Sequence, residues 1–225
     1  FYTSSRPEGL NNIDTVLSVI NTKYYHTEYT TTREKQDYFG IATFSKYPII
    51  NKGKIVFNTR SNNICIYTDV LIEKDTVRVY NMHLQSISFT IKDYAFVDDL
   101  QDGDDAKDEL ENSKNILRRL KRAFVKRAEQ AEKVSVSIKN CRYKIILCGD
   151  FNDTPASYAY NSISNNLKDA FIEKGNGFGR TYVGKFPSFR IDYILHSKDI
   201  KCTKFSRSEE TFTDHYPITA YFKVN

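Results

Sequence analysis

The stretch YKIILCGDFNDTP, residues Tyr143–Pro155, carries the clearest structural signal in the chain. A short apolar run, Ile145–Cys148, stops at Gly149 and is followed by Asp150 and Asn152. Apolar runs of this length predict a buried strand, and the Gly-Asp and Asp-Thr-Pro that follow predict a turn. The segment therefore places one carboxylate and one carboxamide at the end of a rigid strand, where the geometry of a site can be held closely.

The composition of the whole chain indicates a folded, globular domain. Of the 225 residues, 40% are hydrophobic and 27% are charged, which is ordinary for such proteins. We therefore expect one domain over residues 1–225, and a monomer. No apolar run approaches the length of a membrane span, and the four cysteines match no zinc-binding spacing. The net charge of +5 favours a polyanionic partner only weakly.

Many strands and few helices are predicted. Sixteen Tyr and fifteen Phe favour strands. A helix is expected over 11–20 with Asn12 as its cap, another over 157–165, and a polar loop over 89–108. This mixture favours an α/β (α+β) sandwich over a regular βαβ alternation. The expected strands cover residues 24–30, 39–45, 54–58, 64–72, 76–84, 143–148, 168–172, 190–196, 201–206 and 218–223.

A long helix is predicted over 109–139, because apolar residues recur there three and four positions apart. They are Leu117, Leu120, Phe124, Ala128, Ala131, Val134 and Ile138. The opposite face is basic and carries Arg118, Arg119, Lys121, Arg122, Lys126, Arg127 and Lys133. We interpret this basic face as solvated, since acidic residues lie among the cations. Binding of a nucleic-acid backbone is the alternative.

Four predicted strand ends carry the same kinds of polar side chain. Carboxylates, imidazoles and amides of this kind suit the activation of a water molecule, because no Ser-, Cys- or Thr-centred nucleophile motif accompanies them. They also suit a hard cation such as Mg²⁺ and the charge that develops on a phosphoryl group. Each residue alone could be a turn former or a structural histidine. The set consists of Asn81 and His83, Asp150 and Asn152, Asp192, and Asp214 with His215.

Five segments of the chain carry a resemblance to a known family: FGIATFSKYPI (39–49), NMHLQS (81–86), CGDFN (148–152), RIDYIL (190–195) and DHYPI (214–218). On these segments the chain resembles the exonuclease–endonuclease–phosphatase superfamily, which shares the deoxyribonuclease I-like fold. Its members include abasic-site endonucleases, neutral sphingomyelinases and inositol-polyphosphate phosphatases. The resemblance implies a four-layer sandwich, in which two packed, mostly antiparallel sheets are flanked by helices. The wording of GDFNDTP and FPSFRIDYILHS is most similar to bacterial members. The five matching segments occur in the order of the family.

The resemblance implies catalytic roles for five residues. Asp150 would accept a proton from the attacking water or orient it, and Asn152 would position that water and the phosphate. His215 would contact the scissile phosphate, with its tautomer held by Asp192. His83 would stabilise the charge that develops on phosphorus. Whether Asp150 or the pair of Asp192 and His215 takes the proton stays open.

The resemblance also implies a metal and contacts with substrate. Asp214 and Asp150 would lie at the metal site, where Mg²⁺ is expected and Mn²⁺ is the alternative. Asn81 would brace the site or contact the substrate. Arg190 would face the phosphate, with a structural ion pair as the alternative reading.

The beginning of the chain departs from the family pattern. The family carries two N-terminal strands, the second of which ends in Gln-Glu and supplies the principal metal ligand, and neither matches a segment here. We expect that the sequence begins just downstream of that Glu and lacks these strands. Bacterial members often carry membrane-spanning helices upstream, so a bacterial, membrane-tethered domain is one expectation, and the compartment stays open.

The function that follows is Mg²⁺-dependent hydrolysis of a phosphodiester, or of a phosphomonoester, by in-line attack of water. A DNA or RNA endo- or exonuclease is the alternative. A non-catalytic binding module on the same fold is the rival from another class. The partner is expected to be a phosphoester substrate; nucleic acid is one form that this substrate could take.

Overall fold

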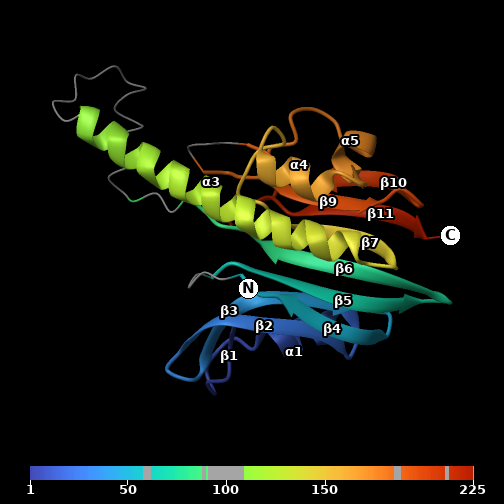
Figure 1. The fold of residues 1–225 in the computed structure, drawn as a ribbon. Helices are drawn as coiled ribbons and strands as arrows, with labels where there is room; N and C mark the ends of the chain where they lie inside the picture. The colour runs from blue at the N-terminus through green and yellow to red at the C-terminus, as the bar shows by residue number, and fades with distance from the viewer. Residues whose placement is uncertain (58–61, 88–89, 91–108, 185–188, 211–212, 225) are drawn as a thin grey trace.

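A six-stranded sheet forms the centre of the computed structural model, which describes residues 1–57, 62–87, 90, 109–184, 189–210 and 213–224 (Figure 1). The strand order is β4-β5-β6-β7-β9-β8. The pairing of β6 with β7 is parallel, and the other four pairings are antiparallel. The strands are β4 (Ile49–Ile55), β5 (Ile64–Ile72), β6 (Asp75–His83), β7 (Lys144–Asp150), β9 (Asp192–Ser197) and β8 (Leu167–Asp169).

Two helices cover one face of this sheet, α3 (Glu109–Lys139) and α4 (Tyr158–Ser164). The main hydrophobic core lies between them and the sheet. Its members come from β5, β6, β7 and β9 on one side and from the helices on the other, among them Tyr80, Leu147, Leu195, Ala131, Val134 and Ile163. Complete burial of these side chains supplies most of the free energy that holds the helices in place.

Two smaller sheets cover the opposite face. One has the order β1-β3-β2 and the other pairs β10 with β11. The first is attached to the central sheet by the hydrogen-bonded pair His26 and Thr68, at 3.0 Å. The second packs on β9 through Ile194 and Cys202. The elements are β1 (Tyr2–Ser4), α1 (Asn12–Ile20), β2 (Tyr24–Arg33), β3 (Asp37–Ser45), α5 (Ala170–Lys174), β10 (Ile200–Arg207) and β11 (Ile218–Val224).

The predicted mixed sandwich of mostly antiparallel sheets and outer helices is confirmed. The second layer differs from the expectation, because it consists of two separate sheets among the described residues. The strand predicted over 168–172 is wrong beyond Asp169, whose side chain accepts a hydrogen bond from the Phe171 backbone and so caps α5. The predicted loop over 89–108 lies outside the described residues apart from Thr90, as does Asn58.

Two local expectations about helices and strands are corrected. The side chain of Asn11, not of Asn12, caps α1 by accepting from the Asp14 backbone N–H. The strand predicted over 54–58 instead runs over Ile49–Ile55, because its pairing with β5 begins opposite Val70. Among the described residues, no helix combines the length and the apolar character needed to cross a membrane.

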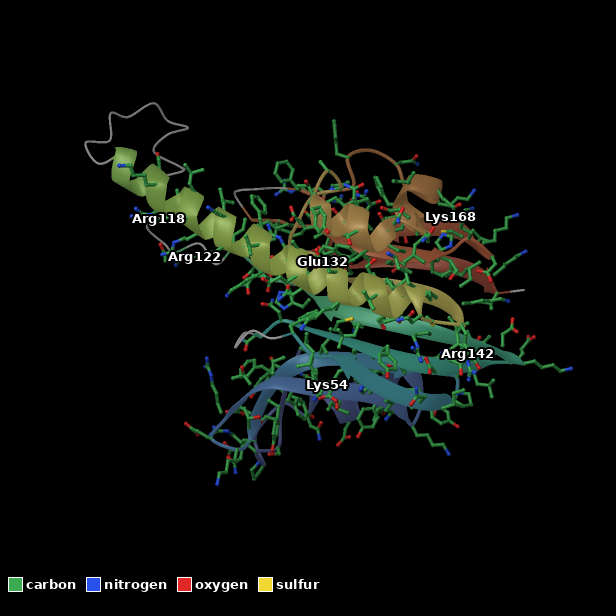
Figure 2. All side chains as sticks on the ribbon, in the orientation of Figure 1. Lys54, Arg118, Arg122, Glu132, Arg142 and Lys168 are labelled. Atoms are coloured by element: carbon green, nitrogen blue, oxygen red, sulfur yellow. The ribbon has the colours of Figure 1, made fainter. Side chains whose placement is uncertain are left out.

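The buried face of α3 also differs from the predicted stripe. Leu117 is 63% exposed and Phe124 is 50% exposed, whereas Ala123, Arg127 and Gln130 are buried. Figure 2 places Arg118 and Arg122 on the half of the helix that extends beyond the sheets. The first half therefore has no sheet to cover, and burial begins only where α3 reaches the core. The solvated basic face is confirmed for Arg122 and is wrong for Arg127.

Shortening Leu147 is expected to destabilise the domain strongly. Its side chain is fully buried in the main core, so Leu147→Ala should lower the free energy of unfolding by about 2–5 kcal/mol, measured by urea denaturation. Leu117→Ala, at an exposed position of α3, is the matched control and should change it by less than about 0.5 kcal/mol. Equal losses for the two variants would contradict this description of the core.

Candidate active site

Backbone pairing brings three of the predicted residues to one edge of the central sheet. His83 is opposite Asp150 in the parallel pairing of β6 with β7. Asp150 is in turn opposite Asp192 in the antiparallel pairing of β7 with β9. Neighbouring strands lie about 4.8 Å apart, so the three side chains are adjacent although they are far apart in sequence. The strand ends thus assemble a row of imidazole, carboxylate and carboxylate.

The turn after β7 fixes the Asp150 carboxylate. Gly149 lies against β6, where an added Cβ would come within 2.1 Å of the Met82 carbonyl oxygen. Asn152 has a φ of 52°, a left-handed conformation that asparagine tolerates better than most residues. Its backbone N–H donates to Asp150 Oδ1 at 2.7 Å, and its side-chain amide donates to Asp150 Oδ2 at 2.8 Å. The two hydrogen bonds from Asn152 therefore fix the orientation of the Asp150 carboxylate.

The environment of Asp150 favours its protonated form. Burial, and then the neighbouring carboxylate of Asp192, raise the pKa of Asp150 to about 7, against the opposing hydrogen bond from the Asn152 backbone. The Nε2 atom of His83 lies 3.6 Å from Asp150 Oδ2. Burial, followed by the charge of His215, lowers the pKa of His83, so this imidazole is neutral at pH 7. Asp150 can therefore exchange a proton near neutrality.

His215 and Asp192 form a close pair on the other side of Asp150. His215 Nδ1 lies 2.8 Å from Asp192 Oδ2. The hydrogen bond to Asp192 outweighs burial and raises the pKa of His215 to about 9. The His215 imidazole is therefore cationic at pH 7. This contact is the one that the resemblance implied for the two residues.

A cavity of about 490 Å³ lies in front of these residues, between the central sheet and the smaller sheets. Its lining includes five of the predicted site residues, which are Asn81, His83, Asp150, Asp192 and His215. The side-chain amide of Asn81 donates to the Ala42 carbonyl at 2.8 Å and so ties β6 to β3. Asn81 thus braces the wall of the cavity, and its contact with substrate stays a prediction.

Arg190 does not line this cavity, and the expectation that it faces the phosphate is corrected. Its guanidinium lies 2.6 Å from the Asp169 carboxylate, and both side chains are buried. It also packs between the rings of Phe171 and Tyr193. A buried carboxylate needs a cation, and Arg190 supplies it to Asp169. The structural ion pair, which the sequence left open, is the arrangement found.

A group of potential metal ligands lies at the site, with a membership that differs from the one expected. Ligand atoms of Asp150, Asp192 and His215 all lie within 4.8 Å of one another. Asp214 is not in this group; its backbone carbonyl accepts from the Val183 N–H at 2.8 Å, and its role as a ligand stays a prediction. Two adjacent carboxylates attract a hard divalent cation, and burial followed by the neighbouring Asp192 carboxylate raises the pKa of Asp150. The carboxylates of Asp150 and Asp192 therefore fit such an ion, and the cationic His215 imidazole lies beside them as a hydrogen-bond donor.

Arg127 of α3, which the sequence analysis assigned to a solvated helix face, supports the active site. It is 1% exposed. Its Nε donates to Asp153 Oδ2 at 2.8 Å and its Nη1 donates to the Gln85 carbonyl at 2.8 Å. It thus joins the turn that follows Asp150 to the chain that follows His83. The sequence held a signal for the burial of Arg127, because Arg127 falls three and four residues before Gln130 and Ala131 on one helical face.

Comparison with known proteins agrees with this geometry. A model of the Endonuclease/Exonuclease/phosphatase family matches residues 5–215, and no curated protein matches the chain. A mannosyl-6-phosphatase from Bacteroides thetaiotaomicron has 15% identity and a TM-score of 0.60, over 94% of this chain and 81% of its own. The human Nocturnin catalytic domain with bound sulfate has 14% identity and a TM-score of 0.57, over 95% and 76%. TDP2 from D. rerio, complexed with a single-strand DNA product, has 12% identity and a TM-score of 0.58, over 94% and 90%. At these identities the likeness is one of fold.

Removing the Arg127 guanidinium is expected to destabilise the protein. Arg127→Met leaves the Asp153 carboxylate without its cation and the Gln85 carbonyl without this donor, which should lower the free energy of unfolding by about 3–5 kcal/mol. Arg122→Met, on the exposed part of the same helix, is the control and should cost less than about 0.5 kcal/mol. Urea denaturation measures both. An Arg127→Met protein as stable as the control would show that the buried pair contributes nothing.

Proposed function

The chain belongs to the Endonuclease/Exonuclease/phosphatase family, whose members are hydrolases acting on phosphoric esters, and we propose that it hydrolyses a phosphodiester by in-line attack of water with Mg²⁺ as cofactor. The observation that carries this proposal is the row of His83, Asp150 and Asp192 at adjacent strand ends, joined by His215. His83, Asp150, Asp192 and His215 all line one cavity, which disfavours a purely binding role.

Asp150 is the proposed acceptor of the proton of the attacking water. A general base works best when its pKa lies near the operating pH, and the pKa of Asp150 is raised to about 7. Its carboxylate lines the cavity and is held by two hydrogen bonds from Asn152. A water between this carboxylate and a phosphorus atom in the cavity would be deprotonated as it attacks.

The two histidines are suited to the charge that develops on the phosphoryl oxygens. The His215 imidazolium, held by Asp192, supplies a positive donor, and the neutral His83 supplies a second N–H. Fixed donors at a developing oxyanion are commonly the largest contribution to catalysis. A phosphate seated between the two imidazoles would have Asp150 beside it. This arrangement requires no covalent intermediate.

A divalent cation fits the acidic side of the site. Asp150 and Asp192 would hold it, with Asp214 as a further candidate from the sequence. When bound, Mg²⁺ stabilises negative charge on the phosphoryl oxygens, and Mn²⁺ offers similar coordination. Its charge would also favour ionised Asp150.

The order of the proposed substrate classes follows the resemblance of the NMHLQS segment, residues 81–86. A phosphodiester is proposed first, with a phosphomonoester as the narrower alternative. A nuclease activity is the second candidate, and its distinguishing sign would be a steep dependence of binding on salt.

Replacement of Asp150 is expected to remove activity. Asp150→Asn keeps the shape of the side chain but loses the base, so hydrolysis should fall by at least about 10²-fold. The assay uses a panel containing a phosphodiester, a phosphomonoester, a phospholipid head group and abasic duplex DNA, each with Mg²⁺. Asp199→Asn, at an exposed turn between β9 and β10, is the matched control and should retain full activity.

The outcomes separate the candidate functions. Hydrolysis of one substrate class that Asp150→Asn abolishes supports the proposal and names the class. Activity that survives Asp150→Asn but not His215→Gln would assign the base to the pair of Asp192 and His215. A folded protein that hydrolyses none of the panel and binds no metal would favour the binding module.

Removal of metal gives an independent test. Dialysis against EDTA should abolish hydrolysis, and Mg²⁺ or Mn²⁺ should restore it, because the two carboxylates need a cation to act together. Titration calorimetry with Mn²⁺ should show binding to the native protein that Asp192→Asn weakens. Full activity in EDTA would exclude the metal-dependent mechanism.

A further inference from the structure

One short segment outside the named sheets links the two members of the Asp192–His215 pair. Residues Arg180–Val183 run between the start of β9 and the segment that carries His215. The Tyr216 backbone N–H donates to the Thr181 carbonyl at 2.8 Å, and the Val183 N–H donates to the Asp214 carbonyl at 2.8 Å. Tyr182 and His215 form an isolated antiparallel bridge. The segment therefore holds the backbone on both sides of His215.

The Thr181 hydroxyl holds the other member of the pair. Thr181 is 1% exposed. Its Oγ1 accepts from the Ile191 backbone N–H at 3.0 Å and from the Asp192 backbone N–H at 3.1 Å. A hydroxyl oxygen has two lone pairs, and both N–H groups lie where β9 begins. One buried oxygen thus attaches the backbone of Asp192 to the segment that is paired with His215.

The Arg180–Val183 segment is held firmly by its neighbours. The Nε of Arg180 donates to the Tyr182 carbonyl at 2.7 Å and its Nη2 donates to the Val183 carbonyl at 2.9 Å. Arg207 donates to the Arg180 carbonyl at 3.1 Å. With the bond from Tyr216, all four carbonyls of the segment accept a hydrogen bond. Because all its carbonyls are hydrogen-bonded, this segment has few alternative conformations. It can therefore fix the position of Asp192 relative to His215.

We propose that Thr181 is a positioning residue, whose hydroxyl sets the distance between the Asp192 carboxylate and the His215 imidazole. The proposal rests on the proposed function of this site as a phosphoesterase. Thr181 does not line the cavity, so it acts through Asp192 and not on substrate. Displacement of a catalytic group by about 1 Å can cost about 10²-fold in rate, so the hydrogen bond from the Asp192 backbone to Thr181 matters in addition to the pairing of β9 with β7.

The test compares two substitutions that differ in one oxygen. Thr181→Val keeps the shape but leaves the Ile191 and Asp192 N–H groups without an acceptor. Thr181→Ser keeps the hydroxyl. Thr203→Val, which removes an exposed hydroxyl that donates to Tyr221 on the β10–β11 sheet, is the matched control. All three are compared with the native chain for melting temperature, kcat, KM and the proton NMR spectrum.

The NMR readout is the low-field resonance of the hydrogen-bonded His215 Nδ1 proton, assigned by its loss in Asp192→Asn. Thr181→Val should shift or broaden this resonance and lower kcat by about 10- to 100-fold, with KM changed by less than about twofold. Thr181→Ser and Thr203→Val should keep both the resonance and kcat. A folded Thr181→Val protein with the native resonance and native kcat would overturn the proposal.

The positioning role can be tested even if the native chain shows no activity or if Thr181→Val does not fold. The NMR comparison needs no substrate, so it decides the positioning role even when the native chain hydrolyses nothing on the panel. If Thr181→Val does not fold, Arg180→Lys takes its place, because lysine keeps the charge but cannot reach both carbonyls as a guanidinium fork does. A native resonance and kcat in folded Arg180→Lys would then count against the segment as the positioning element.

Discussion

The hydrogen-bond ladder through β6, β7 and β9 is the constraint on which the site depends. It fixes His83 opposite Asp150 and Asp150 opposite Asp192. A slip of one residue in either pairing would turn the facing side chain to the other face of the sheet. The register is itself held by the fully buried Tyr80, Leu147 and Leu195, which pack against α3 and α4. Packing on one face of the sheet thus determines chemistry at its edge.

The electrostatics of the site follow from that register. Burial, and then repulsion from the Asp192 carboxylate on the adjacent strand, raise the pKa of Asp150, so it holds a proton far more readily than an exposed aspartate. His215 lies close enough to Asp192 to stay cationic. The result is a buried carboxyl group, Asp150, that can exchange a proton near neutrality beside two imidazoles of different charge. Groups separated in this way can divide the work of proton transfer and charge stabilisation.

Support for this edge comes from both layers that flank the central sheet. Arg127 of α3 joins the turn after β7 to the chain after β6 by two hydrogen bonds. On the opposite side, Asn81 ties β6 to β3, and the Thr181 hydroxyl holds the start of β9. These hydrogen bonds are buried or partly buried, and each joins a side chain to a backbone group or to the turn after β7. Contacts of this kind can hold the site residues in position. His83, Asp150 and Asp192 lie at strand ends between these supports, and His215 lies in the segment that precedes β11.

The sequence by itself determined the main secondary-structure elements and the chemical types of the site residues. The long helix over 109–139 and the strand over 64–72 were predicted with the bounds found, because long periodic segments and apolar runs depend on local pattern. His83, Asp150, Asp192 and His215 were named from strand ends and from the resemblance. Only the tertiary structure decided which groups meet: Arg190 pairs with Asp169, Arg127 pairs with Asp153, and Asp214 is outside the cluster of potential ligands. A charged side chain carries no periodic signal of its own partner, because that partner is set by strand register and layer packing between residues far apart in the chain.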